Sequence, residues 1–130
     1  MTAVDTSVLV RLLTGGHLRQ TAAAKALFSS EPVWIAKTVL LETAWVLRAR
    51  YGFDDGAIAR AFRNLLGVDN VEVEDASCVA AALALTTHGI DLADALHLSS
   101  RPASSSFFSF DRSFVRRAQR AGADHVAALH

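Results

Sequence analysis

The sequence predicts one α/β domain over residues 1–130, with a mainly parallel sheet that helices cover on both faces. Three observations predict this class. The chain has 130 residues, which is close to the commonest domain size. Short apolar segments alternate with longer helical patterns, as they do in parallel sheets built from strand–helix–strand units. Two of these segments end at Asp5 and Asp111, and such folds bind ligands at the carboxyl ends of their strands.

The first half of the chain predicts two strands and four helices. Ala3–Val4 forms a short strand, and the apolar residues after Asp5 recur at helical spacing until Gly15–Gly16. An alanine-rich helix runs from Thr21 to Ser29 and ends before Pro32. The remaining segments are a buried strand over 33–36, a helix from Thr38 to about Arg50, and a helix from Asp54 or Asp55 to Leu66.

The second half repeats the alternation of strand and helix. Val71–Glu74 alternates apolar and charged residues and predicts a strand, and the alanine-rich and leucine-rich helix after it ends at His88–Gly89. Leu92–Ser99 is a further helix, and Phe107–Phe110 is a strand that ends at Asp111. The last two segments are a helix from Ser113 to Ala121 and a strand within 125–129.

Composition excludes several classes of protein. Thirteen Lys and Arg balance thirteen Asp and Glu, so no bulk basic field predicts a nucleic-acid partner. The single cysteine, Cys78, excludes an intrachain disulfide and a multi-cysteine metal site. No apolar run approaches the length of a membrane span, and the segment Met1–Asp5 lacks a basic signal-peptide region. We therefore expect a cytoplasmic protein without a membrane partner.

Four acidic residues occupy apolar stretches in which we expect burial. They are Asp5, Glu42, Asp94 and Asp111. An isolated buried carboxylate costs several kcal/mol unless it is paired or coordinates a cation, so the four acids suggest a shared partner. Oxygen ligands suit Mg²⁺ or Mn²⁺. Such ions activate water and stabilise a leaving oxygen, and phosphodiester hydrolysis is therefore the predicted chemistry.

Each acid also has a purely structural alternative. Asp5 and Asp111 are suitable N-caps for the helices that follow them. Glu42 can face solvent or pair with a distant arginine. Asp91 is expected to cap the helix over 92–99, which leaves Asp94, one turn farther along, as the candidate site residue.

Basic side chains near these acids are candidates for substrate binding. Several arginines crowd the helix after Asp111, and His97 lies three residues after Asp94. Arginines beside an acidic metal site can hold a phosphate backbone, and we therefore select Arg112, Arg116 and His97. The alternative is a solvated helix face with a histidine at its rim.

Taken together and in order, four segments resemble the PIN-domain family, and most of all the VapC toxins of bacterial type II toxin–antitoxin modules. The segments are Val4–Leu9, Glu42 with Ala44–Leu47, Leu92–His97, and Phe108–Phe114. The resemblance covers essentially the whole chain. It implies an α/β/α sandwich around a parallel sheet and an Mg²⁺- or Mn²⁺-dependent endoribonuclease. It also implies a homodimer that a small antitoxin protein silences.

The resemblance also assigns roles to residues of this chain. The family's acidic quartet falls on Asp5, Glu42, Asp94 and Asp111. It implies that three of them, Asp5, Asp94 and Asp111, hold the metal, while Glu42 orients the attacking water or a second ion. Thr6 or Ser7 supplies a supporting hydroxyl. The antitoxin is expected to insert a basic side chain among the carboxylates.

Two other functions remain open from the sequence. A metal-dependent nuclease could act on DNA, because metal-activated water needs no 2′-hydroxyl. A catalytically silent member could use its acids only to bind a basic peptide. A phosphatase of the haloacid dehalogenase type is disfavoured, because Ser7 stands where that chemistry needs a second aspartate.

Overall fold

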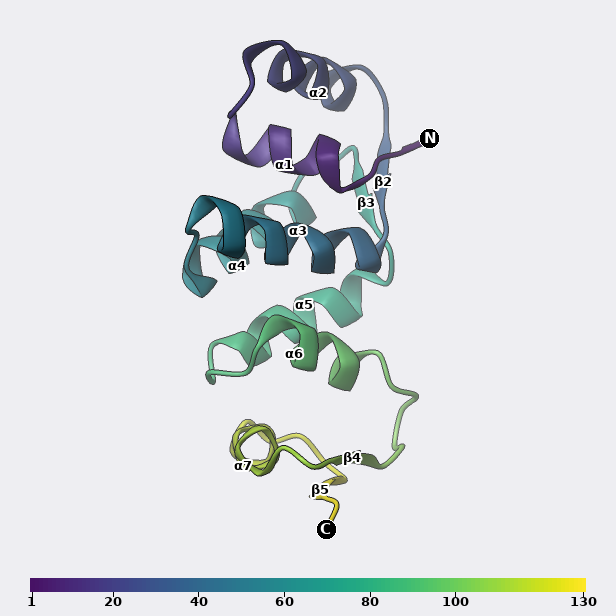
Figure 1. Cartoon of the computed structure of the whole chain (residues 1–130). Helices are drawn as coiled ribbons and strands as arrows, with labels where there is room; N and C mark the ends of the chain where they lie inside the picture. The colour runs from purple at the N-terminus through teal and green to yellow at the C-terminus, as the bar shows by residue number, and fades with distance from the viewer. The chain divides into compact units, whose positions relative to one another are not determined.

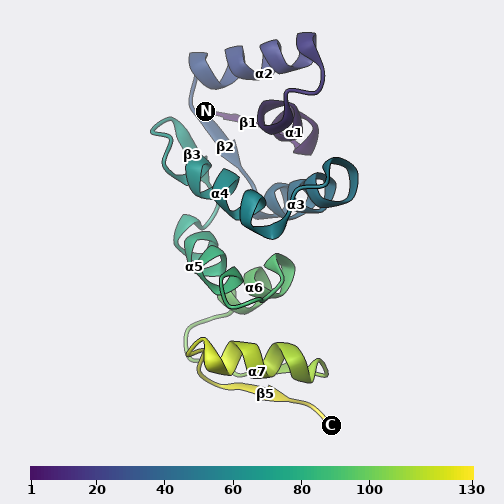
Figure 2. The same ribbon diagram turned by 90° about the vertical axis from the view of Figure 1, so that its left-hand side faces the viewer.

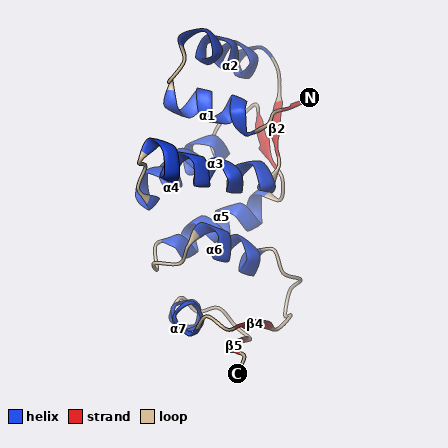
Figure 3. Ribbon diagram, viewed as in Figure 1, coloured by secondary structure: helices blue, strands red, loops and turns tan.

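The computed structural model describes all 130 residues, and the chain divides into two compact units (Figure 1). Unit 1 is Met1–Ala76 and unit 2 is Ser77–His130. Both units combine several helices with short strands (Figure 3). The elements of unit 1 are β1 (Thr2–Ala3), α1 (Thr6–Thr14), α2 (Leu18–Ser30), β2 (Val33–Ile35), α3 (Lys37–Tyr51), α4 (Asp55–Leu66) and β3 (Val71–Val73). Those of unit 2 are α5 (Ala76–Thr86), which begins at the boundary, α6 (Leu92–Ser99), β4 (Phe107–Ser109), α7 (Arg112–Arg120) and β5 (Val126–Ala128).

Unit 1 is a three-stranded parallel sheet with four helices. Its strands lie in the order β1-β2-β3, with Thr2 opposite Val33 and Val33 opposite Val71. Helix α1 packs against α2 and α3, and α3 packs against α4 (Figure 2). Gly15 and Gly52 end α1 and α3 in the left-handed conformation, which glycine adopts without a steric penalty. The fully buried side chains of this unit include Leu9, Val33, Ile35, Leu40, Leu47 and Phe62.

Unit 2 contains a two-stranded parallel sheet, β4-β5, with Phe107 opposite Val126. Helix α7 packs on both strands and runs alongside them (Figure 2). Phe107 of β4 meets Phe114 of α7 edge to face, with ring centroids 5.7 Å apart. Phe114, Val115 and Ala118 are the buried face of α7, so its arginines lie on the opposite, solvated face.

The predicted α/β class with parallel strands is confirmed, but the strands form two separate sheets where the sequence predicted one. Most elements lie within two residues of their predicted bounds. The largest difference is at α2, which begins at Leu18 and not at Thr21. His17 explains the earlier start, because its Nδ1 accepts a hydrogen bond from the backbone N–H of Gln20 at 3.1 Å and caps the helix. No helix of the chain is long and apolar enough to cross a membrane.

Candidate functional site

Asp5 is held as an ionised helix cap at the start of α1. Its Oδ1 accepts hydrogen bonds from the backbone N–H groups of Ser7 at 3.0 Å and Val8 at 3.3 Å. The Ser7 hydroxyl donates to the same oxygen at 2.6 Å. The Ser7 hydroxyl bond, followed by the Val8 N–H bond, lowers the pKa of Asp5. The capping role that the sequence offered as the structural alternative for Asp5 is therefore confirmed.

Glu42 is tied to the same end of unit 1 by Thr6. Helix α1 packs on α3, and the Thr6 hydroxyl donates to Glu42 Oε1 at 2.5 Å. Thr6 directly follows Asp5, so this bond places the Glu42 carboxylate beside the start of α1. The two predicted hydroxyls thus bond to different acids. The Ser7 hydroxyl donates to Asp5, and the Thr6 hydroxyl donates to Glu42.

The expectation that all four acids are buried is wrong for Asp5, Glu42 and Asp111, which are exposed. In α3 the buried face runs through Leu40, Thr43, Ala44 and Leu47. Glu42 lies off this face, and so does Trp45, which is 58% exposed. Apolar neighbours in the sequence therefore did not indicate burial, because residues one or two positions apart on a helix face different ways.

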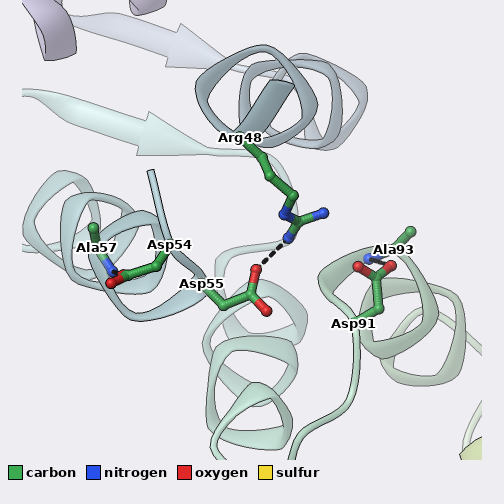
Figure 4. A network of polar contacts seen from close by, with 6 residues as sticks. All are labelled: Arg48, Asp54, Asp55, Ala57, Asp91 and Ala93. Atoms are coloured by element: carbon green, nitrogen blue, oxygen red, sulfur yellow. Dashed lines mark hydrogen bonds and ion pairs between the residues drawn. The ribbon is translucent and has the colours of Figure 1, made fainter. Parts of the chain in front are cut away.

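Asp94 is the one half-buried member of the set. It lies in the first turn of α6 and takes part in no hydrogen bond through its side chain. Burial raises its pKa, the negative charges of Asp91 and Asp111 raise it further, and His97 lowers it. Asp91 caps α6 as expected, since its carboxylate accepts from Ala93 N–H at 3.0 Å (Figure 4). Asp94 is therefore an acid whose ionised form lacks protein donors.

Asp111 caps α7 in unit 2, as its structural alternative predicted. Its Oδ1 accepts from Phe114 N–H at 3.0 Å, and its own N–H donates to the Ser109 hydroxyl at 3.0 Å. The charge of Asp111 contributes to the raised pKa of Asp94, so these two acids interact within unit 2. Unit 1 thus contains Asp5 at the start of α1 and Glu42 bonded to the next residue, Thr6, while unit 2 contains the interacting pair Asp94 and Asp111.

All four acids keep carboxylate oxygens that accept no hydrogen bond from the protein. These oxygens are Oδ2 of Asp5, Oε2 of Glu42, Oδ2 of Asp111 and both side-chain oxygens of Asp94. Such hard, anionic oxygen donors are the kind that Mg²⁺ and Mn²⁺ prefer. No three His, Cys, Asp or Glu side chains of the structure lie close enough together to hold a metal ion. The type of donor suits a divalent cation, but the structure does not gather three of these acids into one cluster. Unit 1 contains two of the acids and unit 2 contains the other two.

The basic residues that lie near the four acids in the sequence differ in their side-chain contacts. Arg48, near Glu42 in the sequence, pairs with Asp55, the first residue of α4 (Figure 4). His97 is exposed on α6. Arg112 and Arg116 are exposed on α7, and neither forms an ion pair with a carboxylate.

Two polar residues beside these arginines were not anticipated from the sequence. Gln119 and His130 line the same groove as Arg112 and Arg116. The spacing of Arg112, Arg116 and Gln119, at positions i, i+4 and i+7 of one helix, is a signal that could have identified Gln119. His130 lies after β5, and only the packing of that strand on α7 brings it to the groove.

Comparisons with known proteins place the chain in a family. The model of the PIN domain matches residues 2–119. No curated protein matches the chain. The crystal structure of Mycobacterium tuberculosis VapC20, described as a sarcin–ricin loop cleaving toxin, is similar to this chain at 23% identity and a TM-score of 0.46. That similarity covers 100% of this chain and 90% of the mycobacterial one. Because the family model spans most of the sequence, the chain belongs to the PIN-domain family.

Proposed function

We propose that the protein is a divalent-metal-dependent endoribonuclease and the toxin of a type II toxin–antitoxin module of the VapBC kind. One observation carries the nuclease assignment. Each acid of the family's quartet keeps at least one carboxylate oxygen without a hydrogen bond from the protein. Acids that served only as helix caps or solvated charges would not explain why this set coincides with the PIN motifs.

The four acids are proposed to divide the work of the site. Asp5, Asp94 and Asp111 would hold Mg²⁺, or Mn²⁺ in its place. When bound, the ion polarises the phosphodiester and stabilises the leaving oxygen. Glu42 is oriented by the Thr6 hydroxyl through Oε1, which leaves Oε2 to accept a hydrogen bond from the attacking water. Burial and the charges of Asp91 and Asp111 raise the pKa of Asp94, so a bound cation would favour its ionised form.

The domain and its partners are part of the same proposal. The match to the PIN domain runs through the boundary between the two units, which supports one domain over residues 1–130. RNA is the proposed substrate, on the strength of the resemblance to VapC toxins. The proposed partners are a second copy of the chain, as a homodimer, and a small antitoxin that places a basic side chain among the acids.

The test compares two aspartates that cap helices in the same way. Asp5 caps α1 and Asp54 caps α4, the latter by accepting from Ala57 N–H at 2.8 Å (Figure 4). Asparagine caps helices about as well as aspartate, so Asp5→Asn and Asp54→Asn each remove one charge and preserve the fold. Purified proteins are incubated with defined RNA and DNA, in Mg²⁺ or in EDTA.

We expect RNA cleavage in Mg²⁺ by the unmodified protein and by Asp54→Asn, and a loss of about 10²- to 10³-fold in Asp5→Asn. Cleavage that survives EDTA, or that Asp5→Asn retains, would contradict the metal mechanism. Cleavage of DNA alone would favour the DNA nuclease. If no nucleic acid is cut but a basic peptide binds tightly, the silent binding partner is the better assignment.

A further inference from the structure

A groove of about 400 Å³ runs between α7 and the segment of β5 in unit 2. Its polar lining consists of Arg112, Arg116 and Gln119 from α7 and of His130, with Ala127 and Ala128 contributing small side chains. Gln119 Nε2 donates to the backbone oxygen of Val126 at 2.9 Å and so fixes β5 along the helix. The groove therefore lies within a packed element pair, and Arg112 in its lining directly follows Asp111 in the sequence.

The charge of this groove is not neutralised by the protein. The one polar contact recorded for the two groove arginines joins Arg112 Nη2 to His130 Nδ1 at 3.3 Å. A guanidinium can only donate, so Nδ1 is the acceptor in this contact. Arg116 forms no hydrogen bond or ion pair. By contrast, Arg117 on another face of α7 donates to the Gly89 backbone oxygen at 3.3 Å.

The spacing of the two arginines suits a linear polyanion. Four residues separate Arg112 from Arg116, which corresponds to about 6 Å along the helix axis. This rise is comparable to the distance between successive phosphates of a single strand. One guanidinium group can bind two oxygens of a phosphate through two parallel N–H donors. Gln119 and His130, which line the same groove, can supply further donors.

We propose that the groove between α7 and β5 binds successive backbone phosphates of the RNA strand next to the one that is cleaved. This inference rests on the proposed nuclease function and identifies where the substrate backbone is held. Carboxylates repel the phosphates on which they act, so a neighbouring groove of free cations offsets that repulsion. An acidic peptide has related charge chemistry, but only RNA is required at a nuclease site.

The test measures binding without cleavage. A labelled short oligouridine is titrated with protein in EDTA at several salt concentrations, and affinity follows from fluorescence anisotropy. Arg112→Gln and Arg116→Gln are each expected to weaken binding about fivefold to tenfold and to reduce the slope of log affinity against log salt by about 0.7. Arg116→Lys keeps the charge and should retain most of the slope. Arg120→Gln is the matched control, because Arg120 is on α7 but does not line the groove.

Several outcomes would overturn the inference. One is unchanged RNA affinity in Arg112→Gln and Arg116→Gln, and another is an equal loss in Arg120→Gln. A third is a variant that binds RNA normally but loses a poly-glutamate probe, since the groove would then be a peptide site. Failure of this inference can be distinguished from failure of the proposed nuclease function. If RNA binds through the groove and is never cut in Mg²⁺, only the proposed function fails, and if RNA is cut while groove variants bind normally, only this inference fails.

Discussion

The two units hold their candidate acids in opposite ways. In unit 1, Asp5 receives three hydrogen bonds on one oxygen and Glu42 receives the Thr6 hydroxyl. The Ser7 hydroxyl and the backbone N–H of Val8 lower the pKa of Asp5. In unit 2, Asp94 receives no donor, and burial together with Asp91 and Asp111 raises its pKa. Unit 1 therefore presents an acid whose charge the protein stabilises, whereas unit 2 presents one whose charge the protein opposes.

This difference shows two ways to prepare an oxygen ligand. Backbone and hydroxyl donors fix the direction of a carboxylate and keep it ionised, which leaves the second oxygen in a defined place. Burial beside like charges makes a carboxylate costly to ionise alone, so a cation that binds there relieves the repulsion. The following predictions test whether the two pairs differ in this way.

The largest expected effect is stabilisation by the metal. Mg²⁺ at about 100 times its dissociation constant should raise the free energy of unfolding by about 2.7 kcal/mol, because it binds only the folded protein. Asp94→Asn should abolish this gain by removing an anionic ligand. The measurement is urea unfolding with and without Mg²⁺. Asp124→Asn is the control, because it removes an exposed carboxylate of unit 2 and should leave the gain in stability intact. An Asp94→Asn protein that Mg²⁺ still stabilises fully would exclude Asp94 as a ligand.

A smaller effect is expected at the hydroxyl that orients Glu42. Thr6→Val removes the donor to Glu42 and should reduce Mg²⁺-dependent RNA cleavage about tenfold to 100-fold, the usual cost of losing a partner that orients a ligand. The measurement is the cleavage rate at saturating Mg²⁺.

Thr43 provides the control for that substitution. It adjoins Glu42 in α3, but its hydroxyl is fully buried and has no hydrogen-bond partner. Thr43→Val should leave cleavage unchanged and should not lower stability, because it removes an unsatisfied polar group. Equal losses of activity in the two variants would show that the Thr6 bond has no special role.

The smallest expected effect is on the pH dependence of the free energy of unfolding in EDTA, to which Asp5 and Asp94 should contribute with opposite signs. The pKa of Asp5 is lowered in the folded state, so its stabilising contribution is present above the unfolded pKa and is lost as pH falls through the folded pKa. The pKa of Asp94 is raised, so the folded state is favoured at low pH and loses that advantage as pH rises through the folded pKa.

The measurement compares urea unfolding of the unmodified protein with Asp5→Asn and Asp94→Asn between acidic and neutral pH. With rising pH, the unmodified protein should gain stability relative to Asp5→Asn and lose it relative to Asp94→Asn. At neutral pH Asp94→Asn should therefore unfold at a higher urea concentration or temperature than the unmodified protein. Two slopes of the same sign would contradict the difference between the units.

Local signals in the sequence predicted most element boundaries. Helix α6 has its predicted bounds, because Asp91 supplies an N-cap just before Leu92. Gly52 ends α3 through another local signal, because it adopts the left-handed conformation at the C-cap. Helix α2 was predicted to begin too late, because histidine is an uncommon cap and its Nδ1 bond to Gln20 is not evident from propensity.

The sequence suggested which acids are candidate site residues, but it did not predict how exposed their side chains are. The order and spacing of Asp5, Glu42, Asp94 and Asp111 contributed to the resemblance to the PIN-domain family, to which the chain belongs. Their exposure did not follow from apolar neighbours, because helical geometry turns Glu42 and Trp45 away from the buried face of α3.

The sequence by itself determined the alternation of strands and helices, the caps at Asp91 and Asp111, and the set of acids, since all of these depend on residues within a few positions of one another. Only the tertiary structure decided which groups each acid meets. The Thr6 bond to Glu42 joins residues 36 positions apart, and the groove beside Arg112 exists because β5 packs on α7. Side-chain partners, and therefore the pKa values and free oxygens of the acids, depend on distances that only the folded chain defines.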